Sequence, residues 1–207
     1  MTRVNKIKFD RLIIATRNNG KLIEFQKLFS GLSFAVTGLD KFDHIEDIEE
    51  TGVSFTENAD LKASGYAAAI GQWTLADDSG LEVSALGGRP GIFSARYGGG
   101  LSAAERNEKL LDELDKSKDL DRSARFICSI SISDPSGRIL TRAEGICGGK
   151  IAPKTFGNNG FGYDPIFIPD GFDRTLGELT SEIKQKISHR AKASAIILRY
   201  LRDFIAG

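Results

Sequence analysis

Apolar and polar residues recur along this chain with two periods, one typical of strands and one typical of helices. Every second residue over 125–133 is apolar, which predicts a strand with one buried face. The turn sequence DPSG follows, so residues 138–150 are expected to return beside that strand as a hairpin. A terminal helix is predicted from apolar residues at helical spacing: Ile197, Leu198, Leu201 and Phe204.

The beginning of the chain has the pattern strand, loop, helix. Residues 11–15 (RLIIA) form a short apolar run, TRNNG is rich in turn formers, and residues 20–29 carry apolar positions at helical spacing. A helix that starts directly after such a loop leaves backbone N–H groups free to bind an anion. A second strand over 34–39 and an acidic loop over 40–50 are predicted to follow.

Two S-x-x-E sequences predict helix starts. Ser54 with Glu57 precedes an alanine-rich helix to about Ile70, and Ser102 with Glu105 opens the helix that contains NEKLLDEL. Residues 73–76 are predicted as a strand that ends in an acidic turn, DDSG, and a short helix is expected from Thr180. Strand–helix alternation together with a hairpin predicts an α/β fold with a mixed central sheet and flanking helices, as one domain over residues 1–207.

Composition limits the partners of this domain. The 28 Lys and Arg residues balance 28 Asp and Glu residues, so no overall field favours nucleic acid or a membrane, and a polyanionic ligand must be bound by a local cluster. The polar N-terminus has no apolar run as long as a signal peptide, and residues 12–15 are too few to span a bilayer. A cytoplasmic protein is therefore expected.

The two cysteines do not form a metal-binding motif. Cys128 and Cys147 lie in predicted strands, and neither has a CxxC partner. Two buried, reduced thiols are the prediction, and a disulfide between them is the alternative.

The loop after the first predicted strand is the first candidate site. Phosphate binding requires backbone N–H groups, hydroxyl or amide donors and a cation near a helix start, and this loop has all three. The P-loop sequence GxxxxGK[ST] is absent, and an ordinary turn with a capping Asn and a solvated Lys is the simpler alternative. The candidate phosphate contacts are Thr16, Arg17, Asn18, Asn19, Gly20 and Lys21.

Carboxylates supply the second candidate site. Asp77 and Asp78 follow a buried strand and point in different directions if strand geometry persists, so one could bind metal or act as a base. An Asx-turn with capping duties is the alternative. Mg²⁺ prefers a few carboxylate oxygens and keeps waters and phosphate oxygens as its other ligands. Glu49 and Glu50, in an acidic run that is otherwise typical of a solvated face, are the nearest source of a second carboxylate.

The last third of the chain carries groups suited to a heterocyclic base. An aromatic ring in a glycine-rich turn can stack on a base, and a carboxylate can accept a hydrogen bond from a ring N–H. Cations further on can neutralise phosphates. FGYDP is also typical of a β-turn and SHR of a helix start. The candidate residues are Phe161, Gly162, Tyr163, Asp164, Lys184, His189 and Arg190.

Five motifs occur in the order found in one enzyme family. They are IIATRNNGKLIEF, ETGVSFTENADLKA, LADDSGLEVSALGGRPGIFSARYGG, FGYDPIF and ISHRAKA, and they extend from about residue 12 to residue 198. The chain thus resembles the inosine/xanthosine triphosphate pyrophosphatases, which remove non-standard purine nucleotides from the pool. The resemblance implies Mg²⁺-dependent hydrolysis of ITP, dITP and XTP to the monophosphate and pyrophosphate, a fold of two lobes around a substrate groove, and a homodimer.

The resemblance also implies roles for individual residues. Asp78, the second aspartate of DDSG, is implied as proton acceptor and metal ligand, and Glu49, the first glutamate of EETG, as a metal ligand. Arg17 stands where the family more often has Gly or His, which leaves the other donors of the loop in place. The implied substrate contacts are Thr16, Arg17, Asn18, Asn19, Gly20, Lys21, Ser79, Phe161, Gly162, Tyr163, Asp164, Lys184, His189 and Arg190.

Purine selectivity should arise at positions 6, 1 and 2 of the base. Hypoxanthine and xanthine carry a 6-oxo group and a protonated N1, whereas adenine has an amino group and a bare N1. Guanine shares the first two features, so its rejection requires steric or polar exclusion at C2 that still admits the 2-oxo group of xanthine.

Two other functions are compatible with the same motifs. One is a Maf-like nucleotide pyrophosphatase that prefers pyrimidine or modified nucleotides. The other is a nucleotide-sensing module without turnover, although pure binding needs donors more than it needs paired carboxylates.

Overall fold

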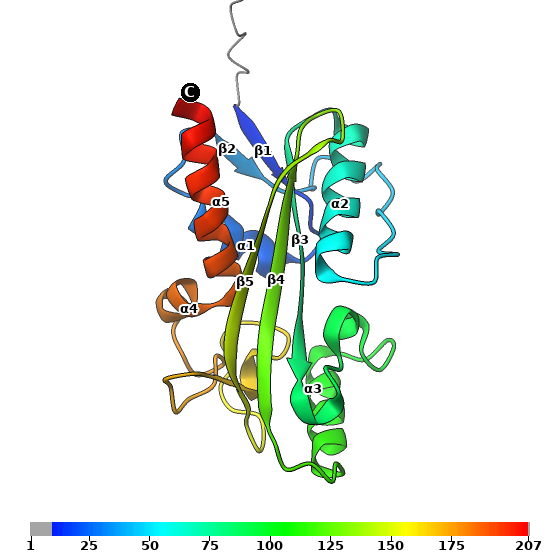
Figure 1. Ribbon diagram of the computed structural model, residues 1–207, viewed down its shortest axis with the longest axis vertical. Helices are drawn as coiled ribbons and strands as arrows, with labels where there is room; N and C mark the ends of the chain where they lie inside the picture. The colour runs from blue at the N-terminus through cyan, green and yellow to red at the C-terminus, as the bar shows by residue number, and fades with distance from the viewer. Residues whose placement is uncertain (1–9, 207) are drawn as a thin grey trace, which may run out of the picture.

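A six-stranded mixed sheet runs through the length of the protein in the computed structural model, which describes residues 10–206 (Figure 1). Strand β1 is parallel to β2 and β3, while β3, β4, β5 and β6 are antiparallel neighbours. The predicted α/β class with a mixed sheet is confirmed. In the order β2-β1-β3-β4-β5-β6, the strands are Ala35–Thr37, Arg11–Ile14, Thr74–Val83, Ser123–Ser133, Ile139–Ile151 and Phe167–Pro169.

The helices begin where the capping residues predict. The side chain of Asn18 caps α1 by accepting from the backbone N–H of Lys21, and Ser102 with Glu105 forms a complete capping box. The predicted box at Ser54 and Glu57 is only half formed. The Ser54 side chain caps α2, but the Glu57 carboxylate accepts from the backbone N–H of Val53 and not from that of Ser54. The helices are α1 (Asn19–Leu28), α2 (Phe55–Ile70), α3 (Ala103–Asp115), α4 (Ser181–Ile187) and α5 (His189–Ala206), with 3₁₀ turns η1 (Ser84–Leu86), η2 (Gly91–Arg96) and η3 (Asp164–Ile166).

The predicted turn at DDSG is wrong, because these residues lie in the middle of β3. Turn propensity is overridden here by pairing, since β4 provides a partner for every residue: Asp77 lies opposite Ile130 and Asp78 opposite Ser129. Strand β1 reaches only as far as Leu75 along the other edge of β3. The acidic part of β3 therefore continues past the carboxyl end of β1, where the loop that follows β1 lies beside it.

The alternation of β3 decides where the two carboxylates point. Leu75 packs with residues of α1 and α5, and Ala76 packs with residues of α2, so these helices cover opposite faces of the sheet. Asp77 accordingly meets Arg190 of α5, and Asp78 meets Asn58 of α2. The prediction that the two carboxylates point in different directions is confirmed.

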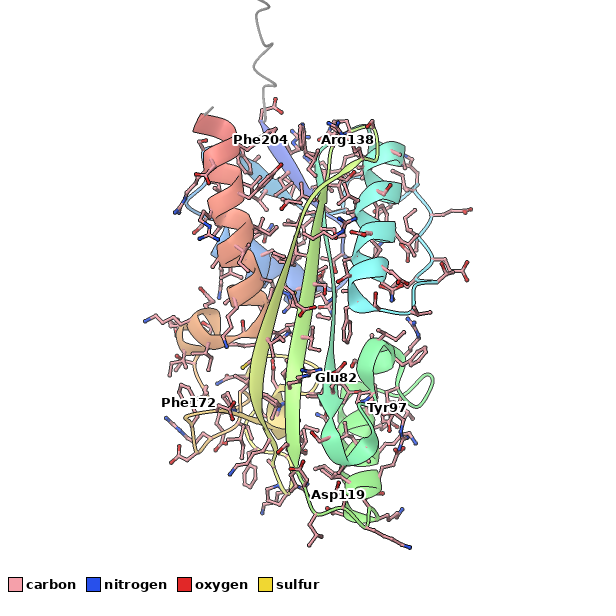
Figure 2. The ribbon with its side chains drawn as sticks, in the orientation of Figure 1. Glu82, Tyr97, Asp119, Arg138, Phe172 and Phe204 are labelled. Atoms are coloured by element: carbon pink, nitrogen blue, oxygen red, sulfur yellow. The ribbon has the colours of Figure 1, made fainter. Side chains whose placement is uncertain are left out.

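Two lobes divide the length of the long strands. Helices α2 and α5 flank one half, and α3 with the loops after β5 surrounds the other half (Figure 1). The second half has its own apolar core, which includes Leu81, Leu110, Phe126 and Phe167. Figure 2 shows Arg138, at the β4–β5 turn, at one end of the molecule and Asp119, between α3 and β4, at the other.

Two further predictions concern burial and membranes. Cys128 and Cys147 are both buried and free, so the prediction of two reduced thiols is confirmed. Within residues 10–206, no helix combines the length and the apolar character that crossing a bilayer requires.

Candidate active site

The loop between β1 and α1 is shaped by hydrogen bonds from its own side chains. Thr16 Oγ1 accepts from the N–H of Asn18 at 3.2 Å, and Asn18 Oδ1 accepts from the N–H of Lys21 at 3.1 Å. These contacts start α1 beside the open edge of β3. The Lys21 ammonium lies 2.9 Å from Asp77 Oδ2, so the cation of the loop is aimed at the carboxylates of the strand.

Asp77 is the anionic centre of a buried charge network. Its Oδ2 lies 3.1 Å from Arg190 Nη2 and accepts from the Ser79 hydroxyl at 3.1 Å, in addition to the contact with Lys21. Burial alone raises the pKa of Asp77, but Lys21 and Arg190 outweigh burial and hold that pKa well below its usual range. Asp77 is thus a permanent charge that orients two cations.

Asp78 has the opposite electrostatic character. It is buried, its Oδ2 accepts from the Asn58 amide at 3.0 Å, and its Oδ1 accepts from the N–H of Ser79 at 3.0 Å. Burial raises the pKa of Asp78, and nearby Glu50 raises it further, while Lys62 and Lys21 only partly offset this. Of the two adjacent carboxylates, Asp78 is therefore the better base.

Lys62 joins the acidic segment, residues 47–50, to β3. Its ammonium donates to Glu50 Oε1 at 2.5 Å and to the backbone carbonyl of Asp77 at 2.7 Å, and it lies 3.8 Å from Asp78 Oδ1. Arg96 of η2 binds the other oxygen of Glu50 at 3.0 Å. Sequence reasoning missed Lys62, although its position one turn after Asn58 on α2 places both on one helix face.

Around the Phe161–Asp164 segment, carboxylates and cations again form a buried network. Lys184 pairs with Asp164 and lies 2.7 Å from Glu24, whose other oxygen is 2.5 Å from Arg190. The Lys184 ammonium also lies 4.5 Å from the centroid of the Phe161 ring. Glu24 was missed as well, because one exposed-looking Glu on an amphipathic helix gives no sequence signal.

His189 is a neutral, stacked side chain in this part of the cleft. Its ring lies 4.7 Å from the ring of Phe126 at an interplanar angle of 11°. Burial, with Arg190 and Lys184 nearby, lowers the pKa of His189 well below its usual value. Its Nδ1 is buried and has no hydrogen-bond partner among the described residues, so the ring has a free polar atom.

Two adjoining cavities are lined by most of these groups, although Asn58, Asp77 and Glu24 border neither cavity. One, of about 600 Å³, is bordered by Asp78 and the acidic segment, and the other, of about 270 Å³, by the Phe161–Asp164 segment. Asn18, Lys21 and Ser79 border both cavities. The sites predicted separately from the loop, the carboxylates and the last third of the chain thus form one cleft.

Three residues of the predicted loop are placed differently from the rest. Asn19, the first residue of α1, lines neither cavity. Gly20 packs against the Phe161 ring, so closely that a Cβ at Gly20 would lie 2.6 Å from a ring atom. Arg17 borders the larger cavity, but its guanidinium contacts Asp43 and Asp47, each at 2.9 Å.

Arg17 therefore ties the phosphate loop to the segment that carries Glu49 and Glu50. If the protein has the Mg²⁺-dependent activity that the resemblance implies, we expect Arg17→Ala to raise the Mg²⁺ concentration needed for half-maximal activity by a few-fold, because exposed ion pairs are worth at most about 1 kcal/mol each. Arg138→Ala, which removes an exposed ion pair with Asp134 at the β4–β5 turn, is the matched control. A higher KM at saturating Mg²⁺, with unchanged Mg²⁺ dependence, would instead make Arg17 a direct substrate contact.

Together, the fold and the cleft define an α/β protein in which a loop that carries Lys21 lies beside two carboxylates of β3, just past the carboxyl end of the parallel strand β1. The chain belongs to the Ham1 family, whose sequence model matches residues 12–200. This confirms the family resemblance found in the sequence motifs.

Individual relatives agree with this family membership. A protein of Nostoc sp. named dITP/XTP pyrophosphatase is 46% identical over 187 residues, which cover 90% of this chain and 92% of the relative. A Bacillus subtilis protein of the same name is 47% identical over 182 residues, covering 87% and 91%. The solved structure of a HAM1 protein from Coxiella burnetii is 40% identical, with a TM-score of 0.86 and coverage of 94% of this chain and 99% of that one.

Proposed function

We propose that this protein hydrolyses non-standard purine nucleoside triphosphates, ITP, dITP and XTP, to the monophosphate and pyrophosphate, and so removes them from the nucleotide pool. The observation that carries the proposal is the shared wall of the two cavities, which puts Lys21 and Ser79 between the Asp78 carboxylate and the Phe161–Asp164 segment. A nucleotide can lie across this wall with its phosphates near Asp78 and its base near Asp164. The names of the relatives support the same substrate class.

The chain's own groups can bind the triphosphate and activate water. The Lys21 ammonium, which borders both cavities, binds phosphate oxygens and offsets the charge that develops on the leaving pyrophosphate, whereas the N–H groups of Asn18 and Lys21 are already bonded to the side chains of Thr16 and Asn18. Asp78, the more basic carboxylate, accepts a proton from the water that attacks the α-phosphorus. Asp77 does not take part directly and instead holds Lys21 and Arg190 in place.

The carboxylates of the larger cavity fit a magnesium ion. Glu49 is exposed on the cavity wall and makes no side-chain hydrogen bond or ion pair within residues 10–206, while Asp78 lies deeper in the same wall. Mg²⁺ commonly binds through one or two carboxylates plus phosphate oxygens and waters, so Glu49 and Asp78 would hold it. When bound, the metal supplies Lewis-acid stabilisation of phosphoryl charge.

The smaller cavity offers the groups that a 6-oxopurine requires. Asp164 can accept a hydrogen bond from N1–H, and a donor from Lys184, His189 or Arg190 can bind the 6-oxo group. Adenine reverses both features and would leave two buried groups unpaired. Phe161 and Tyr163 also border this cavity and provide aromatic surface for the base.

We expect ITP, dITP and XTP to be cleaved at least about a hundredfold faster than ATP. Two mismatched buried polar groups at about 1.4 kcal/mol each give that factor. The measurement is kcat/KM for a panel of triphosphates with Mg²⁺, with products separated chromatographically. Orthophosphate as the first product would place attack at the γ-phosphorus and contradict the mechanism, whereas equal kcat/KM for ITP and ATP would contradict only the substrate class.

The proposal also covers assembly and location. By the family resemblance, the protein acts as a cytoplasmic homodimer on a small-molecule substrate, without nucleic acid or membrane partners. Sedimentation at micromolar concentration tests the dimer, and a mass equal to one chain would contradict it.

A further inference from the structure

The cations of the smaller cavity are almost all neutralised by buried carboxylates. Lys21 and Arg190 pair with Asp77, Lys184 pairs with Asp164, and Glu24 bridges Lys184 and Arg190. Three cations thus face three carboxylates, and each charge has a partner within the network. This set of side chains orients a ligand but brings no net charge to the base.

Arg106 is the exception on the wall of this cavity. It lies in the first turns of α3, and its Nη1 donates to the backbone carbonyl of Leu101 at 2.7 Å. Among residues 10–206, Arg106 forms no ion pair with a carboxylate, and its Nε and Nη2 donate to no acceptor. The cavity therefore contains one guanidinium with free donors and an unbalanced positive charge.

Arg106 is held beside the segment proposed to bind the base. The neighbouring side chain, Asn107, is buried and donates to the carbonyl of Gly162 at 3.1 Å, which fixes α3 against that segment. Arg106 and Tyr163 both line the smaller cavity, where burial raises the pKa of Tyr163. Tyr163 in turn donates to the carbonyl of Ser94 at 3.0 Å.

We propose that Arg106 reads position 2 of the purine and makes the protein favour xanthine while rejecting guanine. A guanidinium only donates hydrogen bonds. It pairs with the 2-oxo group of xanthine, meets a hydrogen in hypoxanthine, and opposes the 2-amino donor of guanine. The xanthine ring of XTP also loses its N3 proton near neutral pH, and the resulting anion gains a charge-assisted hydrogen bond. This inference rests on the proposed function and adds a residue for the step at C2.

The test compares Arg106→Met with wild type on XTP, ITP and GTP. Methionine keeps an unbranched apolar stem and removes the charge and the donors. We expect kcat/KM for XTP to fall roughly tenfold, the value of one charge-assisted hydrogen bond, while ITP changes less than about twofold. The GTP-to-ITP ratio should rise. Arg199→Met, on an exposed position of α5 outside both cavities, controls for loss of one positive charge.

A pH series separates base reading from a structural role. In wild type, the XTP-to-ITP ratio of kcat/KM should rise as xanthine deprotonates, and this rise should disappear in Arg106→Met and return in Arg106→Lys. The variant Arg106→Met keeps Asp164, Lys184, His189, Lys21, Arg190 and Glu24, so a pH dependence of the ratio that comes from these groups would persist in it, whereas one that comes from Arg106 disappears. Equal losses for XTP and ITP would overturn the proposal and make Arg106 a ribose or phosphate contact.

The inference and the proposed function fail in different ways. If wild type cleaves ITP but the XTP-to-ITP ratio of kcat/KM is the same in Arg106→Met as in wild type, only the role of Arg106 is overturned. If wild type cleaves neither triphosphate, the proposed function fails, and calorimetric binding of xanthosine and inosine monophosphates still tests Arg106. Unchanged preference for the xanthine nucleotide in Arg106→Met would then overturn it.

Discussion

Asp78→Asn should lower kcat for ITP by roughly a hundredfold or more while leaving the protein folded. General base catalysis contributes about that factor, and an amide cannot accept the proton of the attacking water. The fold should tolerate the change, because the amide oxygen can still accept from either Asn58 or Ser79, the two donors that the carboxylate binds now. Steady-state kinetics at saturating Mg²⁺, together with a thermal melt, measure both effects.

The neighbouring amide of Asn58 provides the comparison for this result. Asn58→Ala removes a hydrogen bond to Asp78 but leaves its carboxylate, so it should reduce kcat far less than Asp78→Asn does. If Asp78→Asn retained more than a tenth of wild-type kcat, a loss of under about 1.4 kcal/mol, Asp78 would not be the base. Asp77 and Glu50, the other carboxylates near Lys62, would then become the candidates for the general base.

The local pattern of the sequence predicted the elements that hold the site. The alternation over residues 125–133 predicted β4, and the Ser102 capping box predicted the start of α3, because each signal lies within a few residues of its effect. The loop after β1 was expected to bind an anion for the same local reason, and the structure places Lys21 at the cleft.

Contacts between distant segments could not be read in the same way. The pairing of Lys62 with Glu50 and of Glu24 with Arg190 depends on how α2 and α1 pack against the sheet. The DDSG error has the same origin, since turn formers became part of a strand only because β4 supplied a long pairing partner. Arg106 was overlooked because one charged residue on a predicted helix gives no sequence signal, and only the cavity shows what its side chain faces.

Asp77→Asn should destabilise the protein by about 3–5 kcal/mol, the cost of breaking a buried ion pair by removing one partner. Asp77 is fully buried as a side chain and faces Lys21 at 2.9 Å and Arg190 at 3.1 Å, so its loss leaves Lys21 unpaired and Arg190 with Glu24 alone. At about 2–4 °C per kcal/mol for a chain of this size, the melting temperature should fall by roughly 6–20 °C.

The matched control for that stability loss is Asp115→Asn. Asp115 pairs with Arg122 at 3.0 Å on the surface, with its side chain 61% exposed, so its loss should cost less than about 1 kcal/mol. Urea unfolding of wild type and both variants gives the free energies directly. If the two variants lost the same stability, the buried position of Asp77 would add nothing to the ion pairs it makes. A large loss for Asp77→Asn, set beside a stable but inactive Asp78→Asn, would assign the adjacent carboxylates to separate tasks, one holding the cations of the cleft and the other performing the chemistry.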